Sequence, residues 1–310
     1  MKKVVVIGGG SGQSIMLRAI KRMGDIDLKT IVTVADDGGS TGRLREIFNI
    51  PAVGDIRSVM CALSNDEEVI EYLMNFRFDR DSEEFSNHNL GNLIMCALIK
   101  RNHNLYDSIY EMGRLLNIKG EVIPSTLETI TLHAYMDDGV HVRGEHNITG
   151  AKSKVSRVFH EDDVEANPLA INAIIDADYI IYSIGSLYTS IMPSLIIPKI
   201  KNALQKSKAK KIYFCNAMSE EGETLNYSLE DHVQAIEDHT GLLVDIAVCH
   251  NDIIPQEILA KYQLENAHEI KSVENNHHYD IIRSELLTFD KNRIRHDGNK
   301  IIKVLERLLK

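Results

Sequence analysis

Short apolar runs alternate with amphipathic segments along most of the chain, and glycine-rich or polar loops separate them. Between the runs, apolar positions recur at helical spacing, as they do around Ile15, Ile20 and Met23. This alternation predicts an α/β fold with a Rossmann-like, doubly wound, mostly parallel sheet. The runs too short for helices predict buried strands at residues 3–7, 30–34, 177–182, 211–215 and 243–248.

The middle of the chain interrupts this rhythm with a small antiparallel insertion. Residues 129–135 and 140–143 flank the turn Met136-Asp-Asp-Gly139 and predict a β-hairpin. A third strand is expected at 154–159. We therefore expect one Rossmann-like domain over residues 1–310, with a β-rich insertion or lid at about 121–160.

Composition narrows the class of protein. The chain has 310 residues, of which 44% are hydrophobic. Its net charge is −10, which disfavours a nucleic-acid binder that depends on a general basic field. No run approaches the roughly 18 apolar residues of a membrane span. The four cysteines are widely spaced in apolar surroundings, as reduced core thiols are. These features predict a cytoplasmic protein that has no membrane span and does not bind nucleic acid.

The first apolar run leads directly into Gly8-Gly-Gly-Ser-Gly-Gln-Ser14 and then into a helix. Such a loop resembles the dinucleotide-binding fingerprint, whose glycines admit a pyrophosphate to a helix N-terminus. The match is imperfect, because Gln13 stands at the third glycine position, and a merely tight turn is the alternative. The candidate phosphate-binding residues here are Gly9, Gly10, Ser11 and Gly12.

A second polar loop, residues 36–45, follows the strand expected at 30–34. Backbone N–H groups, two carboxylates and two guanidiniums in one short stretch suit a phosphorylated ligand, with or without a divalent metal. Solvated loop acids are the alternative. Asp36 and Asp37 are the candidate Mg²⁺ ligands. The other candidate binding residues in this loop are Gly38, Gly39, Ser40, Arg43 and Arg45.

Two further polar groups open helices. Asp55 is either a helix N-cap or a ligand contact, whereas Arg57 in the first turn opposes the helix dipole and is better explained by an anion. His88 and Asn92 belong to a cluster of four polar side chains at the next helix start, more than capping requires. We therefore treat Asp55, Arg57, His88 and Asn92 as candidate ligand contacts.

Later polar loops repeat this arrangement. Gly185 and Ser186 follow the strand at 177–182, and Asn216 follows the strand at 211–215. In a doubly wound sheet, loops after parallel strands converge where the strand order reverses. One cleft would thus collect the four loops and bind a phosphorylated nucleotide or small molecule. The sequence contains no P-loop, no convincing nucleophile elbow and no zinc-ligand spacing.

The motifs together resemble those of the bacterial gluconeogenesis-factor family, which is related to 2-phospho-L-lactate transferases. The resemblance spans residues 4 to about 250, and Arg295-His-Asp297 is a further likeness that adds Arg295 to the candidate site. Departures are Ser183-Ile184 before Gly185, where the family usually has Gly-Pro, and Val53, where it has Pro. The motifs are Gly8-Gly-Gly-Ser-Gly, Ala35-Asp-Asp-Gly-Gly-Ser-Thr-Gly-Arg-Leu-Arg, Gly54-Asp-Ile-Arg, His88-Asn-Leu-Gly-Asn-Leu, Pro124-Ser-Thr, Gly185-Ser-Leu-Tyr-Thr-Ser and Gly222-Glu-Thr.

The resemblance implies a cytoplasmic nucleotide-sugar-binding factor with a role in cell shape and wall metabolism during growth on gluconeogenic carbon sources. It implies a UDP-sugar or NAD-like ligand and protein partners in cell-wall metabolism. A homo-oligomer is a candidate state that the sequence leaves open. The related transferases use a divalent metal and acids equivalent to Asp36 and Asp37. Two hypotheses follow: a regulatory protein that binds its ligand, or a Mg²⁺-dependent transferase of a phosphorylated small molecule in which Asp37 is catalytic.

Overall fold

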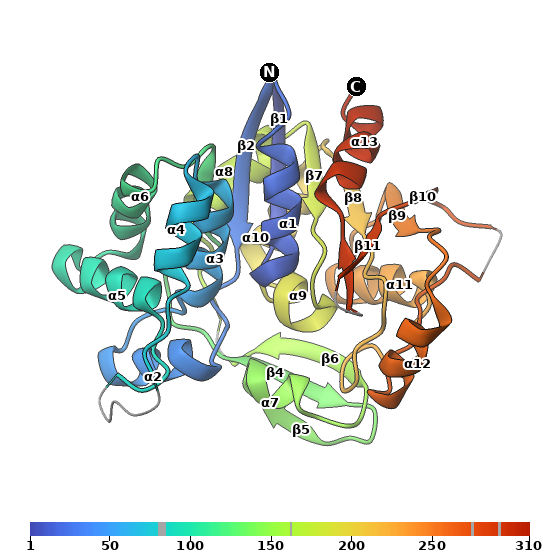
Figure 1. Cartoon of the computed structure of the whole chain (residues 1–310), viewed down its shortest axis with the longest axis horizontal. Helices are drawn as coiled ribbons and strands as arrows, with labels where there is room; N and C mark the ends of the chain where they lie inside the picture. The colour runs from blue at the N-terminus through green and yellow to red at the C-terminus, as the bar shows by residue number, and fades with distance from the viewer. Residues whose placement is uncertain (80–84, 162, 274–275, 291–292) are drawn as a thin grey trace.

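A seven-stranded parallel sheet lies at the centre of the computed structural model (Figure 1). The structure describes residues 1–79, 85–161, 163–273, 276–290 and 293–310. The strand order β10-β9-β8-β7-β1-β2-β3 confirms the predicted doubly wound fold. The strands are β1 (Lys2–Gly8), β2 (Ile26–Val32), β3 (Glu121–Pro124), β7 (Tyr179–Tyr182), β8 (Lys210–Phe214), β9 (Ile246–His250) and β10 (Asp280–Ser284).

Strand order reverses beside β1. From β1 the chain adds β2 and β3 on one side, and then returns to add β7, β8, β9 and β10 on the other. Val4 accordingly pairs with Leu28 on one side and with Tyr179 on the other. Because the loops after β1 and β7 leave toward opposite faces of the sheet, a crevice opens between them.

Burial explains why β1 is central. Val4, Val5, Val6 and Ile7 are at most 2% exposed, as expected for a strand covered on both faces. The strand expected at 30–34 instead runs over Ile26–Val32. It ends there because its partners β1 and β3 end at the same level, opposite Val32.

Helices cover both faces of the sheet. In Figure 1, α1 and α13 lie on the near face, with α8 and α10 behind the sheet. No helix in the described part of the chain is long and apolar enough to cross a membrane. The helices outside the insertion are α1 (Gly10–Ile20), α2 (Gly39–Phe48), α3 (Gly54–Leu63), α4 (Glu67–Met74), α5 (Leu90–Asn102), α6 (Leu105–Leu115), α8 (Pro168–Asp176), the π-helix η1 (Leu187–Ile191), α9 (Met192–Leu195), α10 (Pro198–Lys206), α11 (Leu229–Thr240), α12 (Gln256–Leu264) and α13 (Gly298–Leu308).

The antiparallel part forms a separate three-stranded sheet below the carboxyl edge of the main sheet (Figure 1). It consists of β4 (Leu132–Met136), β5 (His141–Arg143), the short helix α7 (Glu145–Thr149) and β6 (Val155–His160). Within the range 121–160, β3 pairs with β2 in the main sheet. A second hairpin, which the sequence did not predict, joins β11 (Leu287–Asp290) to β12 (Arg293–His296).

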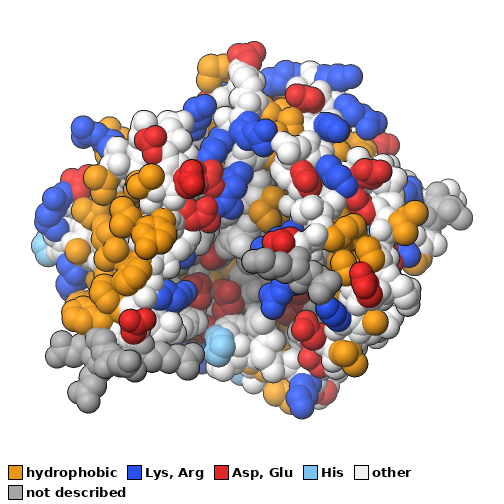
Figure 2. Space-filling view, viewed as in Figure 1, with side chains coloured by type: hydrophobic (Ala, Val, Ile, Leu, Met, Phe, Trp, Pro, Cys, Tyr) orange, Lys and Arg blue, Asp and Glu red, His pale blue; other side chains and the backbone are white. Residues whose placement is uncertain are grey.

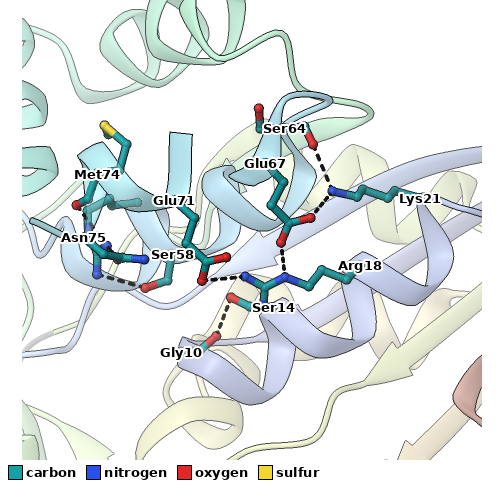
Figure 3. Close-up of polar contacts among 11 residues, drawn as sticks. Gly10, Ser14, Arg18, Lys21, Ser58, Ser64, Glu67, Glu71, Met74 and Asn75 are labelled. Atoms are coloured by element: carbon teal, nitrogen blue, oxygen red, sulfur yellow. Dashed lines mark hydrogen bonds and ion pairs between the residues drawn. The ribbon is translucent and has the colours of Figure 1, made fainter. Parts of the chain in front are cut away.

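Ion pairs attach the segment after α3 to α1. Lys21 Nζ lies 2.5 Å from Glu67 Oε2 and donates to the Ser64 carbonyl at 2.9 Å, and Arg18 Nη2 lies 3.1 Å from Glu71 Oε1 (Figure 3). Side chains that form such a network restrain one another more than an isolated surface pair does. The network therefore stabilises the position of α4 against the helix that begins at the glycine loop.

Gln13 stands where the fingerprint has its third glycine, and its side chain forms hydrogen bonds to β2. Its side chain is fully buried, and its Nε2 donates to Thr30 Oγ1 at 2.7 Å and to the Ile31 carbonyl at 3.1 Å. The close helix approach usually provided by that glycine occurs at Gly12, where an added Cβ would lie 2.2 Å from the Ile184 carbonyl oxygen. Gln13 thus fixes α1 to β2, and Gly12 brings it against the loop after β7.

We expect Gln13→Ala to lower the free energy of unfolding by about 2–3 kcal/mol, because buried hydrogen bonds and packed atoms are lost together. Urea denaturation would measure the change. Gln234→Ala is the control, since Gln234 is exposed and bonds only Asp238 on its own helix. An equal, small loss for both variants would contradict the anchoring role.

Candidate functional site

A cavity of about 470 Å³ lies where the strand order reverses. Loops after β1, β7 and β8 form its walls, together with the start of α3, Glu145 from the insertion and the β12 strand. Nine of the residues predicted from sequence line it: Gly9, Gly10, Ser11, Gly12, Asp55, Gly185, Ser186, Asn216 and Arg295.

Asp55 faces the glycine loop. Its carboxylate accepts the Gly10 N–H, and no side chain caps α3, whose N-cap is Val53. The alternative of Asp55 as an N-cap is therefore wrong. A carboxylate at this position uses one of the backbone donors that a Rossmann loop offers to phosphate.

Asn216 joins the loops after β7 and β8. Its Oδ1 accepts the Gly185 N–H at 3.1 Å, and its Nδ2 donates to the Gly185 carbonyl at 2.9 Å. Ser186 Oγ accepts the Thr189 N–H at 3.2 Å and donates to the buried Glu223. Asn216 and Ser186 thus shape the cavity wall as well as lining it.

Asp36 and Asp37 lie next to the cavity without lining it. Asp36 Oδ1 accepts the Gly38 N–H at 2.8 Å. Burial is the larger cause of the raised pKa of Asp55, and the negative charge of Asp36 raises that pKa further. Asp37 Oδ1 accepts the His146 N–H of the insertion at 2.9 Å. Asp36 therefore faces Asp55, whereas Asp37 faces α7.

The donor chemistry suits a hard divalent cation. Among the residues that the structure describes, no three His, Cys, Asp or Glu side chains form a group that could hold a metal. Mg²⁺ needs only one or two carboxylates when waters and a ligand phosphate complete its coordination. Asp36 acts on the charge of Asp55 in the cavity lining, and a metal held by Asp36 with Asp37 stays a prediction.

The predicted arginines bind the protein's own backbone. Arg43 Nη2 donates to the Ser86 carbonyl at 2.6 Å. Arg45 donates to the carbonyls of Asp36 at 2.8 Å and Ile130 at 2.6 Å, so it joins the 36–45 loop to the chain before β4. Neither arginine lines the cavity, and their ligand roles stay predictions.

The remaining predicted residues form a polar junction of α2, α3 and α5. Arg57 Nε donates to Asn92 Oδ1 at 2.9 Å, and Ser40 Oγ lies 3.2 Å from His88 Nδ1. Asn89 caps α5 through the Asn92 N–H. Gly38 and Gly39 begin α2 beside this junction. The structure brings these residues together with one another, away from the cavity lining.

Three acids around the cavity were not among the candidate site residues of the sequence analysis: Glu145, Glu220 and Glu223. Burial, followed by the charge of Asp36, raises the pKa of Asp55 to about 7. Burial and then the charge of Glu223 raise the pKa of Glu220 to about 8, and burial raises the pKa of Glu145 well above its usual range. Figure 2 shows acidic side chains within the hollow at the centre of this face. Glu223 lies in the recognised motif Gly222-Glu-Thr, whereas nothing in the sequence distinguishes Glu145.

Two other hollows contain side chains already used in packing. One, of about 440 Å³, lies between α6 and β3 and is bordered by Ile109, Ile118 and Val122. The other, of about 630 Å³, lies beside β6, where Lys201 donates to the His239 carbonyl and His239 accepts the Val158 N–H. The switch-point cavity combines backbone donors, an arginine and carboxyl groups, and it can therefore bind a ligand that has both phosphate and hydroxyl groups.

Comparisons with known proteins agree on one family. The family model described as 2-phospho-L-lactate transferase CofD matches residues 4–287. A gluconeogenesis factor of Bacillus subtilis is 40% identical and covers 99% of this chain and 98% of its own. A putative gluconeogenesis factor of Thermotoga maritima is 37% identical over 99% of both chains. A crystal structure from Bacillus halodurans is 38% identical, with a TM-score of 0.92, and covers 98% of this chain and 99% of its own. These matches confirm the resemblance found in the sequence.

The raised pKa of Asp55 predicts a pH-dependent stability change. Its folded pKa of about 7 exceeds its ordinary value of 3.8, so the stability that its protonation contributes is fully present below about pH 4 and is lost as the pH rises to 7. Asp55→Asn stays neutral and should therefore be more stable than the wild type by about 2–4 kcal/mol at pH 8, with little difference at pH 4.

Urea denaturation at both pH values would measure this difference. The exposed hairpin variant Asp137→Asn is the control and should change little at either pH. An Asp55→Asn protein that is less stable at pH 8 than the wild type would contradict the assignment of a strained, buried carboxyl group.

Proposed function

Because the chain belongs to the 2-phospho-L-lactate transferase CofD family, we propose that it binds a nucleotide, in particular a nucleotide sugar, at the switch-point cavity. The observation that carries this proposal is the convergence of the glycine loop, the Asn216-linked loops and Arg295 on one cavity. The cavity volume of about 470 Å³ lies in the range of pockets that bind small organic ligands, the class to which a nucleotide sugar belongs.

Each part of such a ligand has a candidate partner. Apart from the Gly10 N–H, which Asp55 accepts, the backbone N–H groups at the start of α1 favour a diphosphate, since they are not paired within the helix. Arg295 is the arginine in the cavity lining and supplies positive charge among several acids. The hydroxyl groups of ribose and sugar suit the carboxyl groups as hydrogen-bond acceptors.

We infer a regulatory role in the cytoplasm: the liganded state would be presented to partners in cell-wall metabolism. Normal cell shape would then depend on the protein during growth on gluconeogenic carbon sources. Support for this physiology comes from the similarity to proteins named gluconeogenesis factor. Introducing wild-type or Arg295→Ala protein into a strain that lacks the gene, and scoring cell shape on a gluconeogenic carbon source, tests it.

A second candidate function is transfer of a phosphorylated group to an acceptor hydroxyl. The observation that favours it is the Asp55 carboxyl, whose pKa of about 7 suits a group that takes a proton from a hydroxyl near neutral pH. Asp36 and Asp37 would hold Mg²⁺. The bound ion would neutralise phosphate charge during transfer.

Arg295→Ala should weaken UDP-glucose binding by about 1.5–3 kcal/mol, because a charged hydrogen bond to phosphate is lost. Isothermal titration with UDP-glucose and with NAD, each with and without Mg²⁺, would measure the change. Arg101→Ala is the control, since Arg101 is exposed and pairs with Glu111. An equal loss in Arg43→Ala would place the 36–45 loop in the ligand contact as well. Unchanged affinity in Arg295→Ala would count against the proposed site.

Product analysis separates the two functions. For a binding protein, incubation with UDP-glucose plus candidate hydroxyl acceptors and Mg²⁺ should give no new product. Product formation that disappears in Asp37→Asn or Asp55→Asn would establish the transferase instead. Asp137→Asn serves as the matched control for loss of one carboxylate.

A further inference from the structure

Glu145 is the insertion's contribution to the cavity. It lies at the start of α7, directly after β5, and it borders the cavity. Its Oε2 is buried and has no hydrogen-bond partner, and its carboxyl group forms no ion pair with the described residues. A buried carboxyl oxygen without a partner costs free energy, so its persistence needs an explanation.

The surroundings of Glu145 are mostly acidic. Asp55, Asp36, Glu223 and Asp37 all act on its carboxyl group in the direction that disfavours its charge. The negative charge of Glu145 also acts on one cation, Arg45, whose pKa it raises. A structural role for Glu145 would need a donor partner, and among the residues that the structure describes none donates to its Oε2. A phosphate at this position would be repelled by the same acids, whereas a hydroxyl group would not.

We propose that Glu145 recognises the sugar of the bound ligand by hydrogen bonding to its hydroxyl groups. This inference rests on the proposed nucleotide-sugar binding and deepens it, because it divides the cavity into two parts. The glycine loop and Arg295 bind the diphosphate, and the carboxyl group of Glu145 binds the polyhydroxy end. The ligand class is therefore a diphosphate with a sugar beyond it.

The fold holds Glu145 in place through its neighbours. The next residue, His146, donates its N–H to Asp37, and Thr149 Oγ1 donates to the buried Glu223 at 3.1 Å. Gly144 has a φ of +92°, and an added Cβ there would lie 2.3 Å from Asp37 Oδ2. Both ends of α7 are thus attached to loops of the main sheet, which gives the Glu145 carboxyl group a defined direction into the cavity.

The test compares UDP-glucose with UDP by isothermal titration. Glu145→Ala should lose about tenfold or more in affinity for UDP-glucose, the effect of removing one hydrogen bond to a buried carboxyl group. Its affinity for UDP, which lacks the sugar, should stay within about twofold of the wild type. Glu145→Gln keeps a carbonyl acceptor and should recover part of the lost affinity.

Thermal unfolding of the free protein gives a second readout. Glu145→Gln removes a buried ionisable group from an acidic cluster, so its Tm without ligand should equal or exceed that of the wild type. A structural glutamate would give a lower Tm. The control is Glu161→Ala, which removes an exposed glutamate near β6 that pairs with Arg143 and His133. It should leave both affinities unchanged.

The outcomes separate this inference from the proposed function. Failure of the wild type to bind either UDP or UDP-glucose would overturn the proposed function. Two results would overturn only the sugar-recognition role, provided that the wild type binds UDP-glucose. In the first, Glu145→Ala binds UDP-glucose as tightly as the wild type does. In the second, Glu145→Ala loses the same factor in affinity for UDP as for UDP-glucose. A clear drop in the Tm of Glu145→Gln would also overturn it.

Discussion

The close approach of the β1 and β7 loops is the constraint on which the site depends. Gly12 lies against the Ile184 carbonyl so closely that a Cβ would meet it at 2.2 Å, and Gln13 fixes the same helix to β2 from the other side. These two neighbouring residues set the position of α1 relative to both halves of the sheet. The helix start, and the backbone donors that it offers, therefore follow from packing rather than from any ligand contact.

Around this rigid start the protein accumulates acids that weaken its own stability. Burial raises the pKa values of Asp55, Glu145, Glu220 and Glu223, so each is held away from the ionised state that water favours. Glu223 has a structural explanation, because Ser186, Thr149 and Thr189 all donate to it. Asp55 and Glu145 have less compensation, and clusters of such carboxyl groups in a cavity are characteristic of functional sites.

The sequence predicted the fold well because its cues are local. Strands such as β1 are continuous apolar runs, and a glycine loop after the first run indicates a doubly wound sheet. Part of the cavity lining was predicted, through the glycine loops and Asn216. The sequence did not predict the partners of polar side chains where those partners are distant along the chain. Arg45 donates to the Ile130 carbonyl, and Arg57 donates to Asn92. A loop arginine beside glycines has the same local pattern whether it binds phosphate or a carbonyl. Glu145 was missed for the same reason, since only the folded insertion brings it to the cavity.

The insertion and the 36–45 loop consequently depend on each other. Arg45 holds the loop to the chain before β4, and Asp37 accepts a hydrogen bond from α7. The 36–45 loop, predicted from the sequence to bind phosphate, is thus the attachment site of the insertion that carries Glu145. Any ligand or ion that drew Asp37 toward the cavity would have to break the Asp37–His146 bond and release one end of α7. Such a ligand or ion would therefore couple occupancy of the cavity to the position of the insertion.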